Sequence, residues 1–174
     1  MNKHIKRAVM ALVIMAAGYN VARAGPVDIV IVGRVVASPC IINNNNGDLS
    51  VNLGEAIQAA TLQTAGAGTT PKTFNLSLTG CPAGTKNVKV TFTGTAAAAP
   101  QANMYLNSGI ATPLAIELSQ QETGTILGNG SSLTQVVQAD RTVTYALSVR
   151  AVTATGNVTP GLIYAGIQAD FTYN

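Results

Sequence analysis

Residues 27–40 read VDIVIVGRVVASPC and have the pattern of one long β-strand. The odd-numbered positions from 27 to 35 hold only aliphatic side chains and Gly33, whereas the even-numbered positions include Asp28 and Arg34. Mostly β-branched residues that alternate with period two predict an extended segment with one apolar face. A strand at this place either pairs within its own domain or pairs with another copy.

The residues before this stretch predict an export signal. Lys3, Lys6 and Arg7 precede an apolar run over 8–17, and the sequence Ala-Arg-Ala at 22–24 is a small-x-small cleavage pattern. We expect the mature chain to begin at Gly25. The apolar run is shorter than the roughly 20 residues that a spanning helix needs.

Removing the signal changes the charge balance of the chain. Four of the ten Lys and Arg residues lie in residues 1–24, which leaves six cations against seven anions. A basic surface for nucleic acid is therefore not expected. The mature length fits a single domain.

Two cysteines, Cys40 and Cys81, remain in the exported part of the chain. In an oxidising compartment an isolated pair is most simply one disulfide. A metal half-site and a reactive thiol are the competing interpretations. Both are disfavoured because residues 25–174 contain no histidine and no further cysteine.

Short alternating runs separated by Gly, Asn, Pro and Ser clusters predict strands along most of the chain. The expected strands cover 49–53, 73–79, 88–93, 114–118, 133–137, 141–153 and 162–173, and a helical turn or irregular edge is expected within 55–63. This strand spacing, with one disulfide and hardly any helix, indicates an all-β fold: an antiparallel β-sandwich of immunoglobulin-like type.

The sequence contains few of the residues and motifs that catalysis or cofactor binding needs. The single histidine, His4, lies in the signal, and the glycines match neither a phosphate loop nor a dinucleotide motif. The carboxylates are dispersed along the chain: Asp28, Asp48, Glu55, Glu117, Glu122, Asp140 and Asp170. We therefore expect no enzyme, no catalytic residue, no metal, no cofactor and no small-molecule substrate.

The C-terminal run 161–174 alternates in a register that can be counted. One face is uncharged, and it carries Gly161, Ile163, Ala165, Ile167, Ala169, Phe171 and Tyr173. The run is either an ordinary last strand with one side in the core or an unpaired strand that awaits a partner.

The chain resembles the subunits of chaperone–usher fimbriae, in particular the minor tip-fibrillum adaptor subunits of type 1 fimbriae. The resemblance rests on the alternation around Gly33 that leads to Pro39-Cys40, and on the motifs at 78–82, 147–151 and 171–174. Tyr173 is the penultimate residue, and Gly161 is the fourteenth from the end. Asp28 and Val32 depart from the small polar residues usual at their positions.

The resemblance implies an immunoglobulin-like domain that lacks its final strand. Residues 25–38 would be an N-terminal donor-strand extension, and 39–174 the incomplete pilin domain, whose sandwich a neighbour's donor strand completes in trans. A periplasmic pilus chaperone would fill the groove first, and an outer-membrane usher and neighbouring fimbrial subunits would be the further partners. The product would pass through the periplasm into cell-surface fimbriae.

Residue by residue, the resemblance assigns two sets of positions. The donor strand would insert Val27, Ile29, Ile31, Gly33 and Val35. The chaperone and groove strand would be Gly161, Ile163, Ala165, Ile167, Ala169, Phe171 and Tyr173. Gly33 would lie where the groove narrows and a side chain could not fit.

Two alternatives remain at this point. The major shaft subunit of such a fimbria uses the same joint in many copies. A self-contained secreted β-sandwich that binds a ligand would instead use residues 25–38 to complete its own sheet.

Overall fold

The computed structural model describes residues 31–34 and 39–174. The chain divides into two units, Met1–Val35 and Val36–Asn174. In the first unit, residues 31–34 belong to no helix or strand and have exposed side chains. The expected signal segment and the donor positions Val27, Ile29 and Val35 lie outside the described residues.

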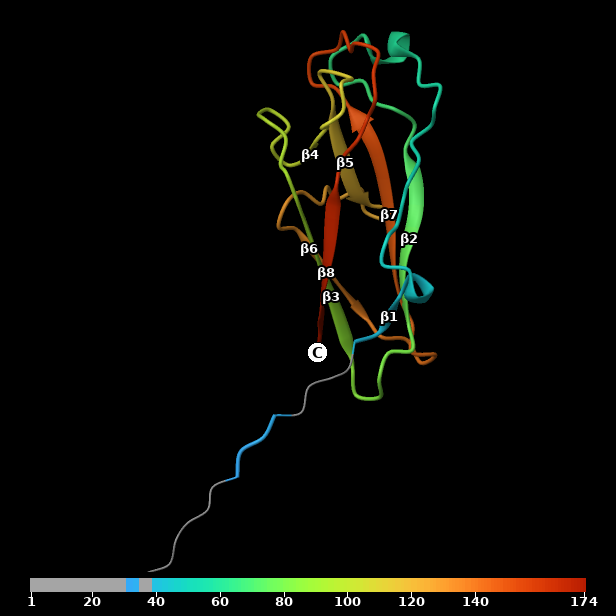
Figure 1. The fold of residues 1–174 in the computed structure, drawn as a ribbon, viewed down its shortest axis with the longest axis vertical. Coiled ribbons are helices and arrows are strands. Elements are labelled where there is room, and N and C mark those ends of the chain that lie inside the picture. Colours follow the sequence, from blue (N-terminus) through green and yellow to red (C-terminus); the bar gives the residue numbers. More distant parts are fainter. Residues whose placement is uncertain (1–30, 35–38) are drawn as a thin grey trace, which may run out of the picture. The chain divides into compact units, whose positions relative to one another are not determined.

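The second unit consists of two antiparallel sheets (Figure 1). The five-stranded sheet has the order β1 (Ile41–Ile42), β2 (Lys72–Thr79), β7 (Val143–Val152), β5 (Ala115–Gln120) and β4 (Tyr105–Leu106). The three-stranded sheet has the order β6 (Ser132–Val136), β3 (Asn87–Gly94) and β8 (Ile167–Tyr173). Two short 3-10 turns, η1 (Asn43–Asn45) and η2 (Ala59–Leu62), complete the regular structure, and no helix in the described part of the chain could cross a bilayer.

Most of the expected strands are confirmed. The runs at 73–79, 88–93, 114–118, 133–137 and 141–153 correspond to β2, β3, β5, β6 and β7, and the helical turn expected within 55–63 is η2. Alternating side chains explain this success, because along β2, β3 and β7 the residues of one face are buried or half-buried between the sheets, and most residues of the other face are more exposed. The antiparallel sandwich is therefore the observed fold.

The prediction of a strand at 49–53 is wrong. These residues form no ladder, although Val51 and Leu53 are half-buried and pack against the core. Asparagine side chains bend the backbone on both sides: Asp48 N–H donates to Asn46 Oδ1 (3.2 Å) and Gly54 N–H to Asn52 Oδ1 (2.8 Å). Local bonds of this kind compete with a sheet ladder.

The last strand is shorter than expected. β8 begins at Ile167, and residues 161–166 instead lie against the loop at 107–111. There the N–H of Ala111 donates to the carbonyl of Leu162 (3.1 Å), and the N–H of Tyr164 donates to the buried side chain of Asn107 (2.8 Å). The loop takes the place that a longer β3 would have filled.

The core lies between the facing sides of the two sheets. Its most deeply buried members include Leu78, Val88, Val90, Val143, Tyr145 and Leu147. The Tyr145 hydroxyl donates to the carbonyl of Val88 (2.7 Å), which links β7 of one sheet to β3 of the other. Cys40 and Cys81 form the expected disulfide beside this core.

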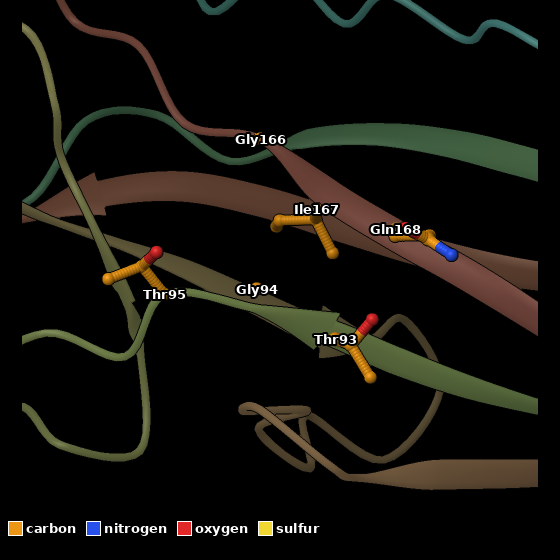
Figure 2. Close-up of a pocket in the computed structure, with 6 residues that line it drawn as sticks. All are labelled: Thr93, Gly94, Thr95, Gly166, Ile167 and Gln168. Atoms are coloured by element: carbon orange, nitrogen blue, oxygen red, sulfur yellow. The ribbon is translucent and has the colours of Figure 1, made fainter.

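The end of β3 requires glycine where it lies beside the start of β8 (Figure 2). A Cβ atom on Gly94 would come within 2.9 Å of the carbonyl oxygen of Gly166 and within 2.9 Å of the Tyr105 ring. We predict that Gly94→Ala lowers the free energy of unfolding by about 1–3 kcal/mol, since overpacking of a filled interior costs this much. Gly166→Ala is the matched control, because a Cβ there meets open space. Equal denaturation midpoints for the two variants would contradict this packing.

The buried phenol of Tyr105 should make the folded domain less stable at high pH. Burial raises the pKa of its phenol from 10.0 to about 12. Above pH 10 the unfolded chain loses this proton while the folded chain keeps it, so stability should fall as pH rises from 10 to 12, by about 2 kcal/mol for this group. Tyr105→Phe should reduce that loss in denaturation curves recorded at pH 9 and pH 12. An unchanged pH dependence in the variant would show that other groups cause it.

Candidate functional site

An open groove of about 1030 Å³ runs along one side of the sandwich. One wall is β8 with the segment that precedes it, and the opposite wall is the irregular segment from Ile42 to Ala59. The floor is apolar and comes from both sheets. It includes Leu76, Phe92, Ile116, Leu118, Leu147 and Val149.

The edge of β8 along this groove has no strand partner in the described structure, since β8 pairs with β3 alone. The N–H groups of Asn87 and Asn174 each donate to the other's carbonyl (3.0 Å both ways). In an antiparallel ladder this fixes which residues bond across the pair. Even-numbered residues of β8 therefore bond to β3. The N–H and C=O groups of Ile167, Ala169, Phe171 and Tyr173 point to the free edge.

The same parity continues through residues 161–166. The backbone groups that bond to the loop at 107–111 belong to Leu162 and Tyr164. Those of Ile163 and Ala165 make no such bond. One edge of unpaired backbone groups thus extends from about residue 161 to residue 173.

The side chains of β8 lack cover on their inner face. Ile167, Ala169 and Phe171 are only half-buried, whereas Val88, Val90 and Phe92 of the neighbouring strand are 0 to 2 % exposed. Phe171 packs against Tyr145, with their ring centroids 6.4 Å apart. A half-covered apolar row beside a free strand edge is the arrangement of a sandwich that lacks a strand.

The structure brings the predicted groove residues together along one wall. Gly161, Ile163, Ala165, Ile167, Ala169 and Phe171 all line the groove. Tyr173 does not line it. This residue is half-buried at the far end of β8, where burial raises the pKa of its phenol and a hydrogen bond to the backbone of Cys40 opposes that rise.

Gly161 has a packing role at the start of this wall. A Cβ atom here would lie 2.7 Å from the backbone nitrogen of Ala111 and 2.7 Å from the Ile110 side chain. Only glycine lets this segment approach the 107–111 loop so closely.

The residues of the opposite wall were not predicted from the sequence as part of the site. Val51, Leu53 and Ile57 are half-buried and line the groove from residues 42–59. Their alternation is visible in the sequence, but it indicates an ordinary strand. The signal that could have placed them is the Asn-rich flanks, which prevent a ladder and leave this segment as a wall.

The groove has an apolar interior and an acidic rim. Asp48 and Glu55 are the charged residues among its described lining. The Arg150–Glu117 ion pair (Nε to Oε1, 2.8 Å) lies elsewhere, between β7 and β5, and its hydrogen bond raises the Arg150 pKa. No cluster of potential metal ligands occurs in the part of the chain that the structure describes. Apolar surface beside unpaired backbone is suited to binding an extended strand.

Comparisons with known proteins agree with this geometry. The family described as fimbrial protein matches residues 29–174. Protein FimG of Escherichia coli strain K12 is 35% identical over 173 residues, which cover 99% of each chain. The P pilus rod subunit PapA has a similar fold, with a TM-score of 0.62 and 20% identity over 79% of this chain and 100% of that one.

A second solved structure, the P pilus adaptor subunit PapF, has a TM-score of 0.55 and 21% identity, covering 81% of this chain and all of that one. These solved structures share the fold, and the family match extends over nearly the whole domain. The chain thus belongs to the fimbrial protein family, as a structural subunit of chaperone–usher fimbriae and not an enzyme.

Proposed function

We propose that this chain is a minor tip adaptor of a type 1-like fimbria and that it polymerises by donor-strand exchange. Its groove takes the N-terminal extension of one neighbour, and its own extension enters the groove of another. The observation that carries the proposal is the free, half-covered edge of β8 beside an apolar groove. Similarity to FimG over the full chain supports the adaptor role.

The donor strand in this proposal is the extension at residues 25–38. Its inward positions are Val27, Ile29, Ile31, Gly33 and Val35. At about 3.3 Å per residue, the segment from Val27 to Val35 spans roughly 30 Å. The free edge from about residue 161 to residue 173 is long enough to pair with all of it.

The binding energy is large enough for a permanent joint. Four buried aliphatic side chains contribute about 6–12 kcal/mol before ordering costs, at roughly 1.5–3 kcal/mol each. Ladder hydrogen bonds add about 0.5–1.5 kcal/mol each. The sum is comparable to the whole stability of a typical domain. A fibre joined in this way would come apart very slowly.

The same groove explains the need for export partners. A free strand edge beside exposed apolar surface is prone to aggregate, so a periplasmic chaperone lends a strand to β8 until an outer-membrane usher presents the next subunit. We propose that the chain reaches fimbriae on the cell surface by this route.

Co-purification from the periplasm tests this proposal. The mature chain with an affinity tag should bring a chaperone with it, and the mixture should convert to chaperone-free complexes once neighbouring subunits are supplied. Recovery of a stable monomer whose groove is filled by its own residues 25–38 would favour the self-contained sandwich instead.

A further inference from the structure

We propose that Asp170 makes the groove select against donor strands with an acidic residue at the position of Asp28. This chain's own extension is such a donor, so the chain joins two different neighbours and does not repeat itself. The inference rests on the proposed donor-strand function and names the partner more narrowly: the extension of another subunit, with a neutral or basic residue at that position.

The outer face of β8 carries the residue that would select the donor strand. Asp170 is exposed there, and its carboxylate accepts hydrogen bonds from the side chains of Gln168 (2.8 Å) and Thr93 (3.4 Å). Lys89 lies on the β3 side, opposite Thr172, and is not ion-paired with Asp170. The side of Asp170 toward the free edge therefore faces any strand that is added to β8.

The parity of the extension determines which residues meet this face. Its odd positions enter the groove, so Asp28 and Arg34 point outward beside the even positions of β8. We expect the added strand to be antiparallel to β8, as is every strand pair of this domain. The antiparallel arrangement is also slightly more stable per residue.

Only a few residues of β8 can then lie opposite Asp28. The inward residues 27–35 must all lie beside the edge at 161–173. Every antiparallel register that satisfies this condition puts Asp28 opposite Gln168, Asp170 or Thr172. In each case Asp28 is opposite or diagonal to Asp170, close enough for two like charges to repel. The same condition in a parallel strand would put Arg34 at these positions instead.

The opposite rim adds to this selection. Asp48 and Glu55 are its charged lining residues, and no cation is found among the described lining. An acidic rim slows the approach of an acidic strand and speeds that of a basic one. This chain's own extension carries Arg34 as well as Asp28, so the rim most favours a donor strand with a basic residue in place of Asp28.

Binding of labelled peptides to the mature chain tests the proposal. The chain carries Ile31→Asp so that its own extension does not compete, and the probes are peptides of residues 25–38 with Asp28 unchanged, Asp28→Asn or Asp28→Lys. We expect Asp28→Lys to bind about tenfold more tightly than the unchanged peptide at low salt, with Asp28→Asn between them. The differences should shrink at 1 M salt.

The acceptor variant Asp170→Asn should abolish most of the difference between peptides. Glu122→Gln, which removes one charge from an exposed turn away from the groove, should leave it intact. Equal binding of all three peptides would overturn the inference while leaving donor-strand exchange standing. The inference would also be overturned if peptide binding changed with Arg34→Glu and not with the substitutions of Asp28. That result would indicate a donor strand parallel to β8. Binding by none of the peptides would contradict the proposed function itself.

Discussion

Replacing Ile31 by aspartate is expected to abolish joining to the neighbouring subunit while leaving the domain and its chaperone complex intact. In the proposed joint, Ile31 would enter an apolar groove whose described floor lacks a partner for a carboxylate. Burying an unpaired charge costs several kcal/mol, and the lost aliphatic contact adds roughly 1.5–3 kcal/mol. We therefore expect more than a 100-fold fall in joined product when chaperone-bound subunits are mixed and analysed by gel electrophoresis without boiling.

Val32→Asp is the matched control, because Val32 would face outward in the proposed donor strand. It introduces the same side chain and should lower joining about fivefold at most. Gly33→Leu should block joining as well, since we expect the groove to narrow where Gly33 lies. Normal fibres from Ile31→Asp or Gly33→Leu would refute the assigned donor face.

Deleting residues 171–174 is expected to prevent recovery of the subunit with its chaperone. The deletion removes the pairing of Phe171 and Tyr173 with β3. It also removes the hydrogen bonds that join Asn174 to Lys86 and Asn87, of 2.7 to 3.0 Å. About half of the strand at which we propose that a chaperone binds is then absent.

Two point variants separate folding from recognition in this experiment. Phe171→Ala keeps the backbone ladder through Asn174, and should cost about 2–3 kcal/mol through lost packing against Tyr145. Thr172→Ala, on the exposed face, should behave as wild type. A truncated subunit recovered with its chaperone at wild-type yield would count against β8 as the docking strand.

The sequence predicts the sheets better than it predicts the groove. Residues of β2, β3 and β7 alternate strictly, and burial of one face fixes both their type and their register. The segment at 49–53 alternates equally well and yet forms no strand, because a pattern of side chains does not reveal whether a backbone partner exists. The segment instead forms the wall of the groove opposite β8.

The two walls of the groove differ in the same way. The residues from Gly161 to Phe171 were assigned by the family resemblance, and their parity in the sequence agrees with that assignment. Val51, Leu53 and Ile57 could not be assigned, since their role depends on the Asn turns and on the gap across from them. The resemblance assigned Tyr173 to the same wall as Gly161 to Phe171, although β8 carries it past the residues that line the groove.

Residue-resolved hydrogen exchange tests the central claim most directly. The mature chain carrying Ile31→Asp would be measured alone and with the Asp28→Asn peptide of residues 25–38. The amides of Ile167, Ala169, Phe171 and Tyr173 face the free edge and should exchange quickly in the chain alone. Those of Gln168, Asp170 and Thr172 bond to β3 and should be protected in both samples. Strong new protection confined to the odd-numbered amides is the predicted result, and an unchanged exchange pattern along β8 would contradict donor-strand binding at this groove.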